Sequence, residues 1–219
     1  MAIVHNPQKH PGPDEADISD IASLAQRAHR LLRRRQRVII GLTGPPGVGK
    51  STLSSSLIDH CGVPAVVVPF DGFHLSSAEL TRLGRQDRKG AIDTFDIAGY
   101  RVLLSRLAAG EPEVIYAPDF DRERDDPISA AVAVPPDTRL ILTEGNYLLV
   151  PEAGINRALF DEVWYLDLDD HLRIERLINR HVRYGKQPEA ARQWALERDE
   201  VNTRLIQRSR LQADLVVHL

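Results

Sequence analysis

Short runs of apolar residues alternate along the chain with longer stretches in which apolar positions recur every three or four residues. The short runs predict buried strands at 38–43, 64–70, 113–118, 139–145, 162–168 and 214–219. The longer stretches predict helices at 17–32, 50–59, 97–109, 170–184 and 188–209. Because apolar strands that alternate with helices form parallel sheets covered on both faces, the pattern predicts a three-layer α/β fold.

The two parts of the chain differ in periodicity. Residues 1–13 are rich in Pro, His and Gly and have no periodic pattern, so we expect a flexible tail there. Residues 14–219 contain no internal repeat and no linker, and their length suits one domain with a substantial core. The sequence therefore predicts a tail followed by a single domain.

Composition and charge narrow the class of protein. A content of 42% hydrophobic and 27% charged residues is typical of a globular protein, and a net charge of −3 favours neither nucleic acid nor a membrane as a partner. The basic run 33–37 is best explained as a solvated helix end. Cys61 is the single cysteine, and no signal peptide or apolar run of about 20 residues is present, so we expect a cytoplasmic protein. The oligomeric state stays open, and a homodimer is compatible with the sequence.

A phosphate-binding motif follows the first long apolar strand. The letters GPPGVGKS match G-x-x-x-x-G-K-[ST] and stand between a predicted strand and a predicted helix, which is the context that this motif requires. Its backbone N–H groups and the helix amino terminus can surround phosphate oxygens. Lys50 is expected to reach the β- and γ-phosphates and Ser51 to ligate Mg²⁺. The candidate nucleotide-binding residues are Gly44, Pro45, Pro46, Gly47, Val48, Gly49, Lys50, Ser51 and Thr52.

The motif alone does not choose among enzymes that use nucleoside triphosphates. The base-reading motif N-K-x-D of GTPases and the L-S-G-G-Q signature of transport ATPases are both missing. The second predicted strand instead runs into PFDGFHL, which puts Asp71 just past its carboxyl end. There the carboxylate can accept a proton from a substrate hydroxyl and orient that hydroxyl for attack on a γ-phosphate. The alternative is an ordinary turn aspartate before Gly72.

Several motifs together resemble a known family. The phosphate loop, PFDGFHL, RKGAIDTFD, PDFDRERDDP and LTEGNYLL occur in the order found in the P-loop kinases that include uridine kinase, phosphoribulokinase and bacterial pantothenate kinase. DGFH and RKG look most like pantothenate kinase, whereas RYGKQPEAARQWALERDEVNTRLI resembles a branch named for fructose-transport-system kinases. The resemblance implies a P-loop NTPase fold with a helical lid at about 170–187, ATP and Mg²⁺ as cofactors, and a small-molecule alcohol as phosphate acceptor.

The resemblance also implies roles for particular residues. Asp71 corresponds to the catalytic aspartate of the family, and Glu144, which ends the strand RLILTEG, corresponds to an acid that holds Mg²⁺. Phe120 takes the place of a tyrosine in the family's P-x-Y-D loop, which disfavours uridine. The implied substrate-binding residues are Asp71, Phe73, His74, Arg88, Phe120, Asp121, Tyr147 and Asn202. His74 and Tyr147 can equally be packed in the interior. Lys89 can contact the acceptor or a phosphate, or belong to a solvated loop, and Asp125 and Asp126 are expected to be solvated.

The predicted lid helix has one basic face. Its arginines at 173, 176, 180 and 183 fall within about 80° of one another, and Ile174, Leu177 and Ile178 lie outside that arc. Such guanidinium groups can neutralise charge on a transferring phosphoryl group. Arg176 and Arg180 correspond best to the lid arginines of the family and complete the candidate catalytic set with Lys50 and Asp71. The alternative is a solvated basic face.

The function predicted from the sequence is transfer of the γ-phosphoryl group of ATP to an alcohol. A sugar or polyol ranks first as acceptor, pantothenate second and a nucleoside such as uridine third. A hypothesis of another class is a nucleotide-binding regulatory ATPase, for which the basic run 33–37 would be the contact surface. Asp71→Asn separates the two, because a kinase needs the carboxylate and a regulator that only binds nucleotide does not.

Overall fold

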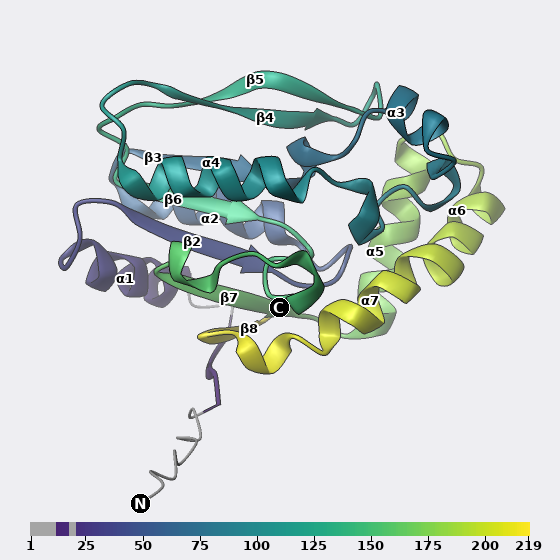
Figure 1. The fold of residues 1–219 in the computed structure, drawn as a ribbon. Coiled ribbons are helices and arrows are strands. Elements are labelled where there is room, and N and C mark those ends of the chain that lie inside the picture. Colours follow the sequence, from purple (N-terminus) through teal and green to yellow (C-terminus); the bar gives the residue numbers. More distant parts are fainter. Residues whose placement is uncertain (1–11, 18–20) are drawn as a thin grey trace, which may run out of the picture.

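Six parallel strands form the central sheet of the computed structural model, which describes residues 12–17 and 21–219. Their order is β1-β8-β7-β2-β6-β3 (Figure 1). The strands are β1 (Asp14–Asp17), β2 (Val38–Thr43), β3 (Ala65–Pro69), β6 (Leu140–Glu144), β7 (Glu162–Asp167) and β8 (Leu215–His218). Five of them lie at predicted runs, which confirms the α/β class. The sequence analysis missed β1 because DEAD has no apolar run; its backbone pairs with β8 from Asp14 opposite Leu215 to Asp17 opposite His218.

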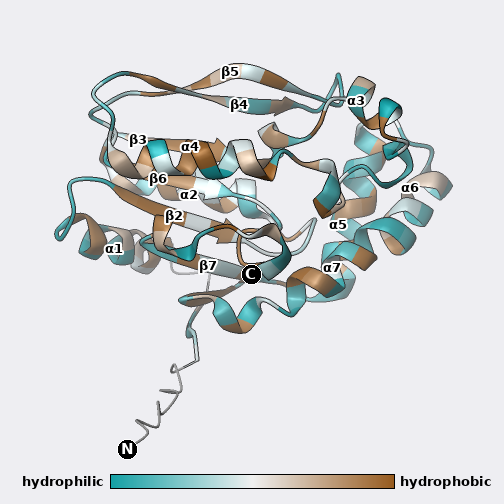
Figure 2. Ribbon diagram, in the orientation of Figure 1, coloured by the Kyte–Doolittle hydropathy of each residue, from teal (hydrophilic) through white to brown (hydrophobic). Residues whose placement is uncertain are grey.

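Helices cover both faces of this sheet. Successive residues of a buried strand point to opposite faces, and Ile39 of β2 accordingly belongs to one apolar cluster while Ile40 belongs to the other. The Ile40 face packs on α1 (Ile21–Leu32) and α2 (Lys50–Cys61), and the Ile39 face packs on α4 (Ile97–Ala109). Apolar residues on the strands and on the inner faces of the helices appear brown in Figure 2.

The expected tail and the start of the first helix fall largely outside the described residues. Of the predicted tail 1–13, only residues 12 and 13 are described, and residues 18–20 of the predicted helix 17–32 are also outside. The described part of that helix begins at Ile21.

Two strands lie outside the main sheet, and one of them corrects the prediction for residues 113–118. The run 113–118 was expected to be a strand of the parallel sheet, but β4 (Ile115–Asp121) pairs antiparallel with β5 (Asp126–Val134) in a separate hairpin. Figure 1 shows the hairpin as a layer of its own, beyond α4 and β3. The sequence did not predict β5, because its alanines have low strand propensity and its partner is visible only in three dimensions.

The segment predicted to form a lid is helical and lies at one end of the sheet, on the right in Figure 1. It begins with α5 (Asp170–Arg183), which packs on α6 (Pro188–Trp194). The predicted second helix is divided into α6, a π-helical turn η7 (Ala195–Asp199) and α7 (Glu200–Gln207). Two further short helices matter for the site: the 3-10 turn η2 (Phe70–Phe73), directly after β3, and α3 (Ser77–Arg82).

Candidate active site

The phosphate loop connects β2 to α2 in a tightly folded turn. Gly44, Gly47 and Gly49 have φ angles of 147°, 84° and 107°, a region that favours glycine. A Cβ on Gly47 would lie 2.8 Å from the carbonyl oxygen of Arg173 on α5, so only glycine allows the lid helix to approach this closely. The loop and the start of the lid are therefore packed as one unit.

Lys50 already lies across this loop. Its Nζ donates to the carbonyl oxygens of Gly44 (2.9 Å) and Pro45 (3.1 Å). Burial lowers the pKa of Lys50 to about 8, against the opposing effect of the carboxylates of Glu144 and Asp71. An ammonium held by carbonyl groups in this position can exchange them for phosphate oxygens.

The order of the strands brings the candidate acids to this loop. β6 lies between β2 and β3, and Glu144 at its end pairs in register with Leu42 of β2 and Pro69 of β3. Asp71 follows two residues after Pro69 in η2. The carboxyl ends of three adjacent parallel strands thus put Lys50, Glu144 and Asp71 at one edge, where open α/β sheets bind their ligands.

Glu144 and Ser51 form a pair of oxygen donors. The Ser51 hydroxyl donates to Glu144 Oε1 at 2.6 Å, and burial raises the pKa of the Glu144 carboxyl. Hard oxygen ligands of this kind fit Mg²⁺, which commonly takes one or two protein oxygens and completes its shell with phosphate and water. Within residues 12–17 and 21–219, no cluster of three or more His, Cys, Asp or Glu side chains can hold a metal ion unaided. A magnesium ion here would accordingly share its ligands with a bound nucleotide.

Asp71 is ionised despite its position in the interior of the site. Burial opposes its ionisation, but the positive charges of Arg122 and Lys50 help to outweigh burial and hold the pKa of the carboxyl below its usual value. Arg122 makes the direct contact, with its guanidinium nitrogen 3.2 Å from Asp71 Oδ2. A carboxylate kept charged beside a phosphate loop can accept a proton from a hydroxyl group.

Aromatic rings pack on His74, which bonds to the backbone of Asp71. The His74 ring lies 3.9 Å from the Phe95 ring and 4.8 Å from the Phe120 ring, measured between centroids. His74 Nδ1 donates to the carbonyl oxygen of Asp71 at 2.8 Å, because a carbonyl can only accept. Burial lowers the pKa of His74, so its imidazole is neutral. Its Nε2 therefore carries no proton and can accept a hydrogen bond.

The arginines of the lid separate into different environments. Arg180 lines the cavity, and in the described part of the chain it has neither a hydrogen bond nor an ion pair to another side chain; burial and the nearby Arg122 lower its pKa. Arg176 is exposed near the phosphate loop, with a guanidinium nitrogen 4.0 Å from where a Cβ of Gly49 would lie. Arg173 corrects the prediction of a uniform basic face. It is buried, donates to the Pro46 carbonyl at 3.3 Å and pairs with Glu200 of α7 at 2.6 Å.

A cavity of about 480 Å³ opens beside these groups. The hairpin, η2 and the lid each contribute to its wall. Of the predicted substrate-binding residues, its lining includes Asp71, His74, Phe120 and Asn202. Sequence reasoning did not select the following lining residues: Gln86, Lys89, Arg122, Asn146, His181 and Asp199.

Four predicted substrate-binding residues lie away from this cavity. Phe73 and Tyr147 are buried in the core; Phe73 packs on Tyr100, and the Tyr147 hydroxyl donates to the Gly90 carbonyl at 2.6 Å. Arg88 pairs with Asp93 at 2.8 Å outside the cavity. Asp121 accepts the backbone N–H groups of two following residues and so closes the hairpin turn.

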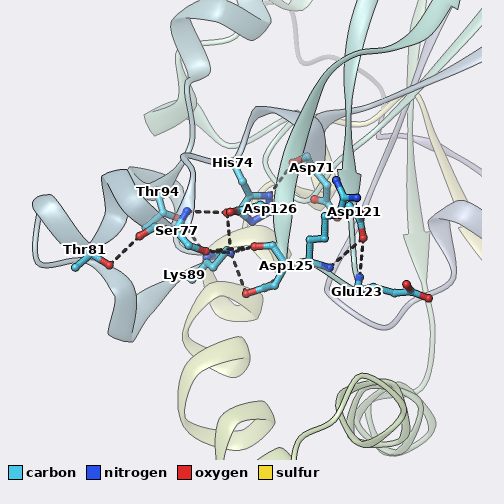
Figure 3. A network of polar contacts seen from close by, with 12 residues as sticks. Asp71, His74, Ser77, Thr81, Lys89, Thr94, Asp121, Glu123, Asp125 and Asp126 are labelled. Atoms are coloured by element: carbon cyan, nitrogen blue, oxygen red, sulfur yellow. Dashed lines mark hydrogen bonds and ion pairs between the residues drawn. The ribbon is translucent and has the colours of Figure 1, made fainter.

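Lys89 occupies the position that the sequence analysis gave to Arg88. Its ammonium donates to the carbonyl oxygen and the carboxylate of Asp125, and to Ser77 Oγ at 3.1 Å, as Figure 3 shows. Ser77 in turn donates its N–H to Asp126 at 2.7 Å. Asp125 and Asp126, expected to be solvated, thus hold the hairpin turn against α3.

Arg122 is the charged residue nearest to Asp71 that sequence reasoning missed. The signal available in the sequence was its position directly after the aromatic–Asp pair in PDFDR. That signal was weak, because the same segment contains Arg124, which lies 75% exposed beside Asp121. Only the fold distinguishes the two arginines.

The sheet, the phosphate loop and the acids at its edge define a P-loop kinase that acts on a small molecule. The sequence profile of the Phosphoribulokinase / Uridine kinase family matches residues 39–219, and the chain belongs to this family. It is therefore an ATP-dependent phosphotransferase with an alcohol group as acceptor. This confirms the resemblance on which the site residues were chosen.

Similar proteins carry different names. A Schizosaccharomyces pombe protein provisionally named a uridine kinase is 33% identical over 93% of this chain and 92% of its own length. A solved structure from Silicibacter, provisionally named a fructose transport system kinase, is 38% identical, with a TM-score of 0.80 over 90% of this chain and 98% of its own. A Limosilactobacillus reuteri pantothenate kinase is 34% identical over 67% of this chain, which spans about half of that enzyme (51%).

No helix in the described ranges is long and apolar enough to cross a membrane.

Proposed function

We propose that this kinase transfers the γ-phosphoryl group of ATP to a hydroxyl group of a sugar or polyol, with Mg²⁺ as the metal. The observation that carries the proposal is the position of the Asp71 carboxylate, which faces a polar cavity beside the phosphate loop. The residues that line the cavity include Gln86, Asn146 and Asn202, whose side chains are amides. Amides donate and accept hydrogen bonds at once, as a polyhydroxylated acceptor requires.

The proposed mechanism assigns one task to each group. The acceptor hydroxyl gives its proton to Asp71 as its oxygen forms a bond to the γ-phosphorus, and the bond from that phosphorus to the bridging oxygen breaks, leaving ADP. Lys50 and Arg180 neutralise charge on the phosphoryl oxygens. Ser51 and Glu144 would hold the magnesium ion, which supplies further charge neutralisation when bound.

Pantothenate and uridine rank lower as acceptors. Pantothenate is second, supported by the DGFH and RKG motifs and by the similar pantothenate kinase, of which this chain spans only half. Uridine is third, because Phe120 lines the cavity without the hydroxyl group that a tyrosine would supply.

The test is ADP release with MgATP against a panel of fructose, other sugars and polyols, pantothenate, uridine and cytidine. We expect a sugar or polyol to raise turnover, and Asp71→Asn to lower the stimulated rate by about 10²-fold or more. Asp137→Asn is the matched control. Asp137 is exposed and does not line the cavity, so this variant should leave the rate unchanged. Slow ATP hydrolysis that no acceptor accelerates and that Asp71→Asn leaves unchanged would instead favour a regulatory ATPase.

A further inference from the structure

Arg122 reaches the cavity from the β4–β5 hairpin and not from the lid helices. It lies in the turn between β4 and β5, while Arg180 lies on α5, and both line the same cavity. The guanidinium of Arg122 is 3.2 Å from Asp71 Oδ2, and the two side chains are 37% and 31% exposed. The contact is thus open to the cavity and can be broken without unfolding any element.

The turn that carries Arg122 is held in place by contacts that do not involve Arg122. Lys89 binds Asp125, and the N–H of Ser77 binds Asp126 at 2.7 Å (Figure 3). Asp121 closes the turn through two backbone N–H groups. The backbone is therefore fixed, and the long side chain of Arg122 is the part that can change partner.

Three cations converge on the site around Asp71. Lys50, Arg122 and Arg180 converge on the site and repel one another, as the lowered pKa of Arg180 beside Arg122 reflects. The carboxylates that act on these cations are Asp71, Glu144 and Asp199, and Ser51 already occupies an oxygen of Glu144. Cations held together in this way favour a multiply charged anion between them, such as a phosphoryl group.

A guanidinium bound to a general base also makes that base weaker. Arg122 favours the charged form of Asp71 and so lowers its affinity for the proton that it must accept. Efficient proton transfer requires Arg122 to leave the carboxylate during the reaction. A γ-phosphate bound at Lys50 offers a stronger partner close by.

We propose that Arg122 is a catalytic residue, which moves from Asp71 to the oxygens of the transferring γ-phosphoryl group. This inference rests on the proposed function. The move neutralises charge on the phosphoryl group from the hairpin side, while Arg180 does so from the lid side. It frees Asp71 to take the proton of the acceptor hydroxyl as the new oxygen–phosphorus bond forms and the bond to the ADP oxygen breaks.

The experiment compares Arg122→Gln, Arg122→Lys and the control Arg124→Gln, which removes an exposed arginine from the same turn. The probe is MgADP, titrated alone and with aluminium fluoride, which mimics the phosphoryl group in transfer. We expect Arg122→Gln to weaken the fluoride complex by about 10³-fold, as loss of a catalytic arginine does, and to change MgADP binding less than twofold. Arg122→Lys should recover part of the loss, and Arg124→Gln should match the wild type.

The pH profile provides a second readout. Without Arg122 the pKa of Asp71 rises, so the acidic limb of kcat/KM should move to higher pH in Arg122→Gln and stay unchanged in Arg124→Gln. The proposal would be overturned if Arg122→Gln weakened the binding of MgADP and of the fluoride complex equally. It would also be overturned if aluminium fluoride did not change the binding of ADP to the wild-type protein. A normal fluoride complex in Arg122→Gln, in an enzyme whose wild type phosphorylates a panel sugar, would refute Arg122 alone and leave the proposed function standing.

Discussion

Replacing Gly72 with alanine tests whether the hairpin sets the position of Asp71. Gly72 follows Asp71, the proposed general base, in η2, and the backbone of β4 packs directly against it. A Cβ on Gly72 would lie 2.4 Å from the Pro118 carbonyl oxygen and 2.6 Å from its carbon. Because these are backbone atoms, no side-chain rotation can relieve the contact.

The size of the effect follows from this distance. Ordinary contact begins near 3.4 Å, so η2 and β4 must separate by about 1 Å. Overpacking of this kind costs about 1–3 kcal/mol of the free energy of unfolding. A displacement of about 1 Å at a catalytic group lowers turnover by about 10²-fold, so we expect a loss of kcat far larger than the loss of stability suggests.

The control is Gly62→Ala, at the end of α2. Gly62 has a φ of 58° with open space around its Cα, so alanine there should cost about 1–2 kcal/mol through backbone strain alone. Both variants are compared by urea unfolding and by acceptor-stimulated ADP release. If Gly72→Ala turned over as fast as Gly62→Ala at equal stability, the hairpin would not position Asp71.

Two further predictions concern Lys50 and Arg173. Since the pKa of Lys50 is about 8 without nucleotide, its charge is lost as pH rises, and the Kd for ATP should rise about tenfold per pH unit above 8. Titrations from pH 7 to 10 measure this, and Lys50→Arg should be flat; an equally steep Lys50→Arg curve would assign the titration to another group. Arg173→Met should lower the free energy of unfolding by about 3 kcal/mol, because it leaves Glu200 without its partner, whereas Arg176→Met on the exposed side should change it by less than about 0.5 kcal/mol. Equal unfolding midpoints for the two arginine variants would contradict this.

The edge of the sheet was predictable because each of its parts has a local signature. The letters of the phosphate loop, an apolar strand ending in Glu144, and another followed by Asp71 are all visible in the sequence. The rule that parallel strands end at one edge then brings them together without knowledge of the strand order. The lid helices were predictable from periodicity for the same reason.

The cavity wall was not predictable, because contacts distant in sequence orient its side chains. Arg88 and Lys89 are neighbours, yet Arg88 turns to Asp93 while Lys89 turns to Asp125, 36 residues away. Arg173 and Arg180 share one side of the helical wheel, but they are two turns apart along the axis. At those two heights α5 meets different neighbours, the phosphate loop and α7 for Arg173 and the open cavity for Arg180.

The buried contacts of Arg173 fix one end of α5 in place. Arg173 joins the helix to the Pro46 carbonyl and to Glu200, and Arg180 lies seven residues further along. At 1.5 Å of rise per residue, the arm between pivot and guanidinium-bearing residue is about 10 Å long. Rocking α5 by about 10° would move the Arg180 backbone by about 2 Å, enough to make or break contact with a phosphoryl oxygen. The distance that Arg180 travels in such a rotation is thus set by its separation from Arg173 along α5. Fewer or more residues between the two would change how far a given rotation moves the guanidinium group.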